Sequence, residues 1–213
     1  MKKFLAFGAA ALAVFAVPAT LAAMPPAHAW DIGPVIRGKN YSVGMPATPR
    51  ADARGGLTFE FPQVGRGEVD AMTTDIRSLR GAREITMVYR VDATRGTRFV
   101  PSEQRDRPAT VSIYFQRRGD NWSGRGRYGS YRWYVPGRAV LPITPGTHRV
   151  TIRLDERWTN VNGKPNTEDR AGFEAALAEA SKIGVAFGTS GRRSHGVAAT
   201  GPARFTLLSL DIT

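Results

Sequence analysis

The chain of 213 residues contains no cysteine and few histidines or lysines. Without cysteine it can form no disulfide and carry no lipid on an N-terminal cysteine, so a folded domain must be stabilised by its hydrophobic core. Histidine is also scarce, since only His148 and His195 lie beyond residue 29. Because cysteine and histidine are the usual zinc ligands, we expect no metal site and no cofactor.

Apolar runs long enough to span a membrane are also absent, except for one at the N-terminus. This alanine-rich run follows Lys2 and Lys3 and precedes Ala27 and Ala29. A basic start, an apolar run and a small-x-small site are the parts of a secretory signal. An uncleaved membrane anchor is the alternative, disfavoured by the cleavage site. We therefore predict a signal peptide at residues 1–29 and a periplasmic or secreted protein without a transmembrane segment after cleavage.

The charge is strongly positive and comes from arginine. The formal net charge is +12, and beyond the predicted signal the only lysines are Lys39, Lys164 and Lys182. Arginine favours bidentate contacts with phosphate, sulfate or carboxylate. The arginines are dispersed, and no nucleic-acid-binding signature is present. We predict a bias towards an anionic partner, such as an anionic glycan or cell-envelope polymer, and no nucleic-acid binding.

Residues 30–56 are rich in glycine and proline, which forbid long regular elements. We interpret them as an irregular N-terminal arm, with Trp30 docked on the body of the protein.

Alternation of apolar and polar residues begins at residue 57 and indicates strands with one buried face. It is clearest at 57–61, 84–91, 111–116 and 150–154, and further strands are expected at 67–73, 130–135, 183–187 and 204–213. In the last strand the parity of the apolar residues changes between Leu207 and Leu208. A slip of one residue reverses the faces of a strand, so we predict a β-bulge there.

One segment, residues 167–181, has helical spacing of its apolar residues, with Asn166 or Thr167 as its expected cap. A parallel α/β fold would need several such helices. The sequence therefore predicts an all-β protein: a two-sheet jelly-roll β-sandwich at residues 57–213 with one short helix.

The order of these segments resembles the galactose-binding-like jelly-roll group, the architecture of many carbohydrate-binding modules. The resemblance lies in the strand at 57–61, the strand at 111–115, Trp158 before the helix, and the closing run Gly201-Pro202-Ala203-Arg204-Phe205-Thr206-Leu207. It implies a sugar site on a concave sheet or at loop tips, and in some members structural calcium. No motif is strict enough to transfer individual binding residues.

The stretch 114–134 alternates aromatic and arginine residues, which suits stacking on sugar rings with hydrogen bonds to hydroxyl groups. If Val111, Ile113 and Phe115 face the core, their neighbours face outward. For residues 130–135 two parities are open, and we favour Trp133 and Val135 as the inward pair. The predicted ligand-binding face then comprises Tyr114, Gln116, Arg132, Tyr134 and perhaps Arg153, with Trp122 at its rim. Burial of these aromatics as ordinary sheet residues is the alternative.

A second candidate is the loop 187–196, in which Ser190, Arg192, Arg193 and His195 suit an anion-binding concavity. It lacks the ending of a phosphate-binding loop, and a flexible hairpin tip is the simpler interpretation.

Signals for catalysis are poor, because no nucleophile motif is present and no pair of carboxylates stands out. Asp120-Asn121 or Glu168-Asp169 would suit calcium, but each is more simply a turn or a helix cap. We predict a non-catalytic extracytoplasmic glycan-binding protein. The alternatives are a glycan-acting enzyme, which a carboxylate pair lining a cleft would favour, and a structural envelope protein, which a convex surface without aromatics would favour.

Overall fold

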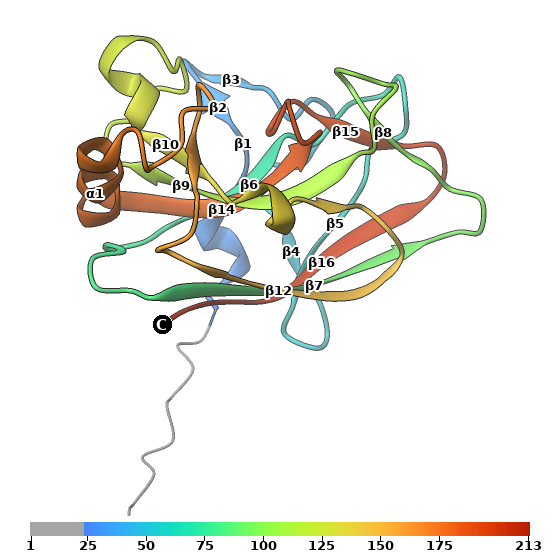
Figure 1. Ribbon diagram of the computed structural model, residues 1–213. Helices are drawn as coiled ribbons and strands as arrows, with labels where there is room; N and C mark the ends of the chain where they lie inside the picture. Colours follow the sequence, from blue (N-terminus) through green and yellow to red (C-terminus); the bar gives the residue numbers. More distant parts are fainter. Residues whose placement is uncertain (1–23) are drawn as a thin grey trace, which may run out of the picture.

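The computed structural model describes residues 24–213, which form two antiparallel sheets packed face to face (Figure 1). The seven-stranded sheet has the order β1 (Trp30–Gly33), β6 (Ala71–Asp75), β14 (Ala180–Gly188), β9 (Thr110–Arg117), β10 (Arg132–Tyr134) and β13 (Thr159–Asn160), with β11 (Leu141–Pro142) beside β9. The five-stranded sheet has the order β12 (Gly146–Arg153), β7 (Glu84–Ala93), β16 (Ala203–Ile212), β5 (Leu57–Glu60) and β4 (Arg50–Ala51). Two short pairs join β2 (Val35–Ile36) to β3 (Lys39–Asn40) and β8 (Phe99–Pro101) to β15 (Val197–Ala199).

The strand order is that of a jelly roll. The eight principal strands, in chain order, are β5, β6, β7, β9, β10, β12, β14 and β16. All eight overlap predicted segments, although β6 begins four residues after the start of the segment predicted at 67–73. Numbered in this order, they run 2-7-4-5 in one sheet and 6-3-8-1 in the other. Successive strands thus cross repeatedly between the sheets, as in the paired Greek keys of this architecture. The predicted jelly-roll β-sandwich is confirmed.

The hydrophobic core lies between the sheets and receives the inward residues of every principal strand. Val111, Ile113 and Phe115 of β9 face it, as does Trp133 of β10. Trp158 is also fully buried and lies against Phe173 of the helix, 6.3 Å between ring centroids. The inward side of β9 and β10 is therefore the predicted one. Because successive side chains of a strand point to opposite faces, the other side chains of β9 and β10 lie on the outer face of the seven-stranded sheet.

Three local predictions have different outcomes. The β-bulge is confirmed, since the register of β16 on β7 shifts between Leu207 and Ser209. The helix α1 is shorter than expected, Arg170–Ala178, and neither Asn166 nor Thr167 caps it. Asp169 does, because its carboxylate accepts a hydrogen bond from the Gly172 amide at 3.2 Å. An aspartate here satisfies a free amide of the first turn, which the more distant side chains cannot reach.

The N-terminal arm is not irregular throughout. Trp30–Gly33 form β1 and pair with β6 at the edge of the seven-stranded sheet. Trp30 is fully buried in the core, as predicted. The sequence concealed this strand because a glycine and a proline end it after four residues, too few for a recognisable alternation.

The predicted signal peptide falls mainly on residues 1–23, which lie outside the described residues. Of its last part, Ala27–Ala29 form one turn of 3-10 helix, and the Trp30 indole N–H donates to the Pro25 carbonyl at 3.2 Å. Within residues 24–213, no helix has the length and apolar character needed to cross a membrane.

Candidate functional site

The predicted ligand-binding face lies on the expected side of the sheet but is largely covered. Tyr114, Tyr134, Gln116 and Arg132 point away from the core and yet are almost fully buried. The segment between β9 and β10 folds back over them, and Trp122 packs edge-on against Tyr114 with 5.8 Å between ring centroids. The prediction that these side chains are exposed is therefore wrong. Alternation indicates on which side of a sheet a side chain lies but not what covers that side.

A buried ion pair anchors this covering segment. The Arg132 guanidinium donates to Asp120 Oδ2 at 2.8 Å, and both side chains are at most 4% exposed. Gln116 donates to the same carboxylate oxygen at 2.6 Å, while Arg132 Nε donates to the Tyr134 hydroxyl at 3.1 Å. The guanidinium also lies 4.3 Å from the centroid of the Trp122 ring. Arg132 therefore holds Trp122 in place by charge, hydrogen bonds and a cation–π contact.

Three predicted residues are unavailable to a ligand in this face, because two are enclosed and one lies in the other sheet. Tyr114 is enclosed, its hydroxyl hydrogen-bonded to Thr73, and burial raises the pKa of its phenol above the ordinary value. Gln116 is enclosed with Asp120. Arg153 belongs to β12 in the other sheet and pairs with Asp155, so the prediction that it shares this face is wrong. Spacing alone did not reveal which sheet β12 joins.

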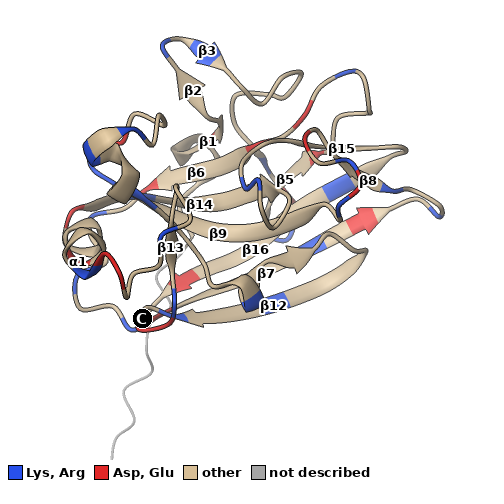
Figure 2. Ribbon diagram, turned by 45° about the horizontal axis from the view of Figure 1, so that its top comes forward, with Lys and Arg blue, Asp and Glu red and all other residues tan. Residues whose placement is uncertain are grey.

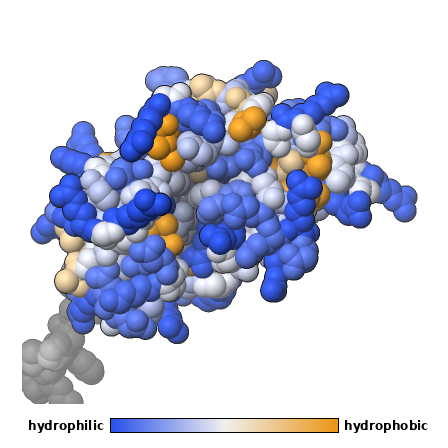
Figure 3. All heavy atoms as spheres, turned by 90° about the horizontal axis from the view of Figure 1, so that it is seen from above, coloured by the Kyte–Doolittle hydropathy of each residue, from blue (hydrophilic) through white to orange (hydrophobic). Residues whose placement is uncertain are grey.

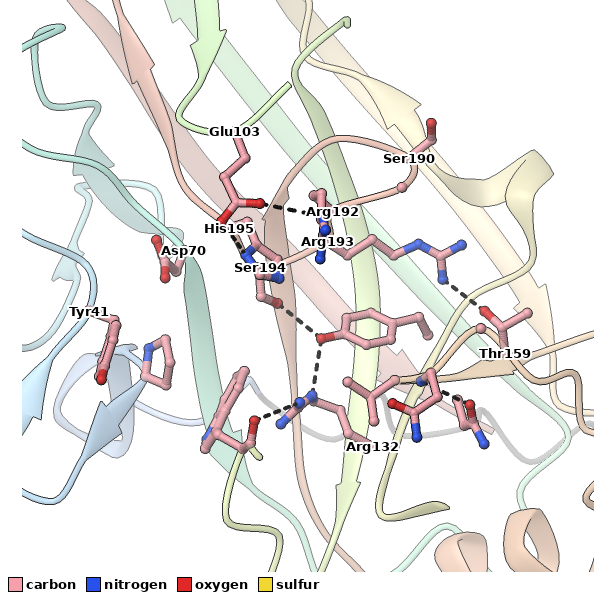
Figure 4. Close-up of a pocket in the computed structure, with 18 of the residues that line it drawn as sticks. Tyr41, Asp70, Glu103, Arg132, Thr159, Ser190, Arg192, Arg193, Ser194 and His195 are labelled. Atoms are coloured by element: carbon pink, nitrogen blue, oxygen red, sulfur yellow. Dashed lines mark hydrogen bonds and ion pairs between the residues drawn. The ribbon is translucent and has the colours of Figure 1, made fainter. Parts of the chain in front are cut away.

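The two candidate sites predicted from the sequence meet in space. The loop between β14 and β15 lies over Tyr134, whose hydroxyl is 3.4 Å from Ser194 Oγ. The Arg193 guanidinium lies 5.4 Å from the centroid of the Tyr134 ring. Ser190, Arg192, Arg193 and His195 thus share one cleft with Trp122, Arg132 and Tyr134. The aromatic stretch and the basic loop form a single candidate site (Figure 4).

The cleft has a volume of about 960 Å³ and opens on the outer face of the seven-stranded sheet. The N-terminal arm, through Tyr41, and the segment before β6 also line the cleft. The same face is mostly hydrophilic, with only scattered hydrophobic side chains (Figure 3). Trp122 and Ser194 both have left-handed backbone, at φ 65° and 59°. Such strain in residues other than glycine clusters at functional sites, which supports this cleft as the site.

Arg193 is the cation most available to a ligand. One of its nitrogens donates to the Val135 carbonyl and the Thr159 hydroxyl, at 3.3 and 3.1 Å. Within residues 24–213 it has no carboxylate partner, in contrast to Arg192, which pairs with Glu103 at 3.5 Å. Burial lowers the pKa of the Arg193 guanidinium, although arginine remains charged at neutral pH. A half-buried, fixed and unneutralised guanidinium is suited to an anionic group of a ligand.

Glu103 is engaged at the rim of the cleft. It accepts from Arg192 and lies 3.1 Å from His195 Nδ1, so it ties the basic loop to the segment after β8 (Figure 4). Thr189 tightens the same loop, because its hydroxyl bonds both Gln104 and the Arg192 amide, at 2.7 and 2.9 Å. These contacts place the loop against the cleft.

Two carboxyl groups that sequence reasoning missed also line the cleft, Glu68 and Asp70. Asp70 is only 7% exposed, and its Oδ1 has no hydrogen-bond partner in the described chain. Burial, with the nearby charges of Glu68 and Glu103, raises the pKa of Asp70 from 3.8 to about 8. One signal was available: Glu68 and Asp70 flank Val69 in a predicted strand, so a buried Val69 turns both carboxyl groups to the outer face.

The other acidic candidates have structural roles. Asp120 neutralises Arg132 and Asp169 caps the helix, as described above. Among residues 24–213, no group of three or more histidine, aspartate or glutamate side chains is arranged to hold a metal ion. Lysine and arginine residues are spread over both sheets and their loops, interspersed with acidic residues (Figure 2). Charge alone therefore does not single out one face, whereas the cleft does.

No protein-family model and no curated protein matches the chain. Three solved structures are similar in part. Xylanase 10C from Cellvibrio japonicus, a mutant solved with xylopentaose, is 16% identical with a TM-score of 0.37, over 87% of this chain and 28% of that chain. A candidate glycoside hydrolase from Bacteroides thetaiotaomicron is 8% identical with a TM-score of 0.36, over 81% and 55%. Another from Bacteroides vulgatus is 11% identical with a TM-score of 0.33, over 86% and 76%.

The chain thus spans about a quarter of the first of these proteins and about half of the second. All three TM-scores lie below 0.5, so these structures do not establish a shared fold or function.

Proposed function

We propose that this protein is an exported glycan-binding protein of the galactose-binding-like jelly-roll type and that its cleft binds an acidic glycan. The observation that carries the proposal is one open cleft combining a half-exposed indole, Trp122, with an unneutralised guanidinium, Arg193, and carboxyl groups. Rings stack on the apolar faces of sugars, and fixed polar side chains bind their hydroxyl and acidic groups. A structural envelope protein, the alternative considered above, would be favoured by a convex surface without aromatics, and this cleft does not resemble such a surface.

Arg193 is expected to recognise the acidic group. Arg193→Gln should weaken binding of polygalacturonate, a carboxylated glycan, by about tenfold to a hundredfold, because a charge-assisted hydrogen bond contributes about 1.5–3 kcal/mol. Binding of dextran, a neutral glycan, should change little. Titration calorimetry at moderate salt measures both, since salt screens contacts to exposed charges.

Arg153→Gln is the matched control, because it removes the same charge from β12 of the five-stranded sheet, whereas the cleft lies on the seven-stranded sheet. It should leave the affinity for polygalacturonate unchanged. Equal losses in the two variants would show diffuse attraction to a basic surface and contradict a specific site.

Trp122 is expected to supply the stacking surface. Trp122→Ala should reduce affinity for polygalacturonate by about tenfold or more, which corresponds to roughly 1.4 kcal/mol. Trp122→Phe keeps an aromatic ring over Arg132 and should retain most of the affinity. If Trp122→Ala binds as tightly as the wild type while its circular dichroism is unchanged, the ligand does not contact this wall of the cleft.

A further inference from the structure

The carboxyl groups of Glu68 and Asp70 have no evident structural purpose. Asp70 is more than nine-tenths buried with an unpartnered oxygen, and Glu68 forms no ion pair within residues 24–213. Burial of an unsatisfied polar group costs folding free energy, so such a group in a cleft calls for a functional explanation. Figure 4 shows Asp70 at the cleft between Tyr41 and His195.

The spacing of the two residues suits work on a glycosidic bond. Val69 between them is buried in the core and pairs with Val197, so the segment is extended and its two carboxyl groups share the outer face. Residues two apart in a strand are separated by about 6.6 Å between Cα atoms. Pairs of carboxyl groups that cleave glycosidic bonds are about 5–10 Å apart.

The environments of the two groups differ in the way that acid and base roles require. Asp70 is enclosed and holds its proton near neutral pH, with a pKa raised to about 8. Glu68 is half-exposed and lies against the backbone of Gly196, where a Cβ would approach Glu68 Oε2 to 2.5 Å. An enclosed carboxyl group next to a more exposed one is an arrangement typical of a paired acid and base. Glu103 is less suited as the base because Arg192 and His195 occupy it.

The geometry points to hydrolysis of a glycosidic bond in the cleft, with Asp70 as the general acid and Glu68 as the general base. This inference rests on the proposed binding of an acidic glycan and adds a reaction to it. The Asp70 proton moves to the bridging oxygen as the bond from C1 to that oxygen breaks, and the oxygen keeps the electron pair. A water molecule forms the new bond to C1 and transfers its proton to Glu68. Exchange with solvent then restores both groups.

Arg193 has a positioning part in this reaction. It lies in the same cleft, fixed by Val135 and Thr159, and would hold the acidic group of the sugar while Asp70 faces the bond to be broken. Fixed orientation of the substrate relative to the acid is a large part of the gain that an enzyme provides.

The test measures reducing ends released from polygalacturonate, together with its binding by calorimetry. The wild type should release reducing ends, with a rate that falls as the pH rises through about 8, where Asp70 loses its proton. Asp70→Asn should lower the rate by at least about a hundredfold, as removal of a general acid or base does, with affinity nearly unchanged. Glu68→Gln should do the same. Asp106→Asn is the matched control. It removes an exposed carboxylate between β8 and β9 and should keep the full rate.

Each of the other outcomes contradicts one stated part of the proposal. Polygalacturonate that binds without release of reducing ends by the wild type overturns hydrolysis and leaves the binding function standing. An Asp70→Asn variant as active as the wild type overturns the role of Asp70. A product with a carbon–carbon double bond, seen by ultraviolet absorbance, shows elimination and overturns the hydrolytic step. Failure of polygalacturonate to bind contradicts the proposed function itself.

Discussion

Replacement of Asp120 by alanine is expected to lower the free energy of unfolding by about 3–5 kcal/mol. The variant would leave the Arg132 guanidinium, which is only 3% exposed, without its carboxylate partner. Gln116 and the Trp122 amide would also lose an acceptor. Because these contacts hold the segment that carries Trp122, glycan binding should fall together with stability. Denaturant unfolding measures the first effect and calorimetry the second.

Asp155→Ala provides the matched control. It also removes an aspartate paired with an arginine, but Arg153 and Asp155 are 67% and 64% exposed. Solvent screens such a pair, so the loss of stability should be much smaller than that of Asp120→Ala. If the two variants lose equal stability, the Arg132–Asp120 pair is hydrated in solution and does not anchor the covering segment.

Replacement of Asp70 by asparagine is expected to stabilise the protein, and the gain should grow with pH. Between pH 3.8 and about 8 the folded state holds a proton on Asp70 that the unfolded state has released. The folded state therefore binds more protons, and the contribution of Asp70 to stability falls by about 1.4 kcal/mol per pH unit in this window. Asparagine cannot ionise, so the difference between variant and wild type should widen by that slope.

Denaturant unfolding at several pH values from about 4 to about 8 measures this difference, since the contributions of all other groups cancel. Asp106→Asn should show no such trend, because that carboxylate is exposed. A constant difference between wild type and Asp70→Asn across the range would mean that Asp70 titrates normally. Stabilisation of a variant that has lost its activity is the expected result for a residue retained for function.

Much of the fold was predictable because strand alternation is a local property. Alternation was clear in four of the eight principal strands, β5, β7, β9 and β12, and the change of parity at Leu207 and Leu208 located the bulge. The short strand β1 was missed, since four residues before a proline carry too little alternation. The cap of α1 was misplaced by a few residues because several capping side chains stand in a row, and only the helix geometry selects Asp169.

The site was predictable only in part, because it depends on contacts between distant segments. Seven of the ten residues singled out from the sequence line the cleft, as two stretches that seemed separate: Trp122, Arg132 and Tyr134 in one, and Ser190, Arg192, Arg193 and His195 in the other. Tyr114 and Gln116 are covered, and Arg153 belongs to the other sheet.

By itself the sequence determined the eight principal strands and the inward faces of those with clear alternation, because both follow from the local order of apolar and polar residues. The absence of cysteine likewise determined that the fold depends on its core and not on disulfides. Only the tertiary structure decided that the loop of Arg193 meets Tyr134, that Asp120 neutralises a buried Arg132, and that Asp70 is enclosed beside Glu68. Burial and the pKa of a carboxyl group depend on neighbours brought together from remote parts of the chain, and no local pattern encodes them.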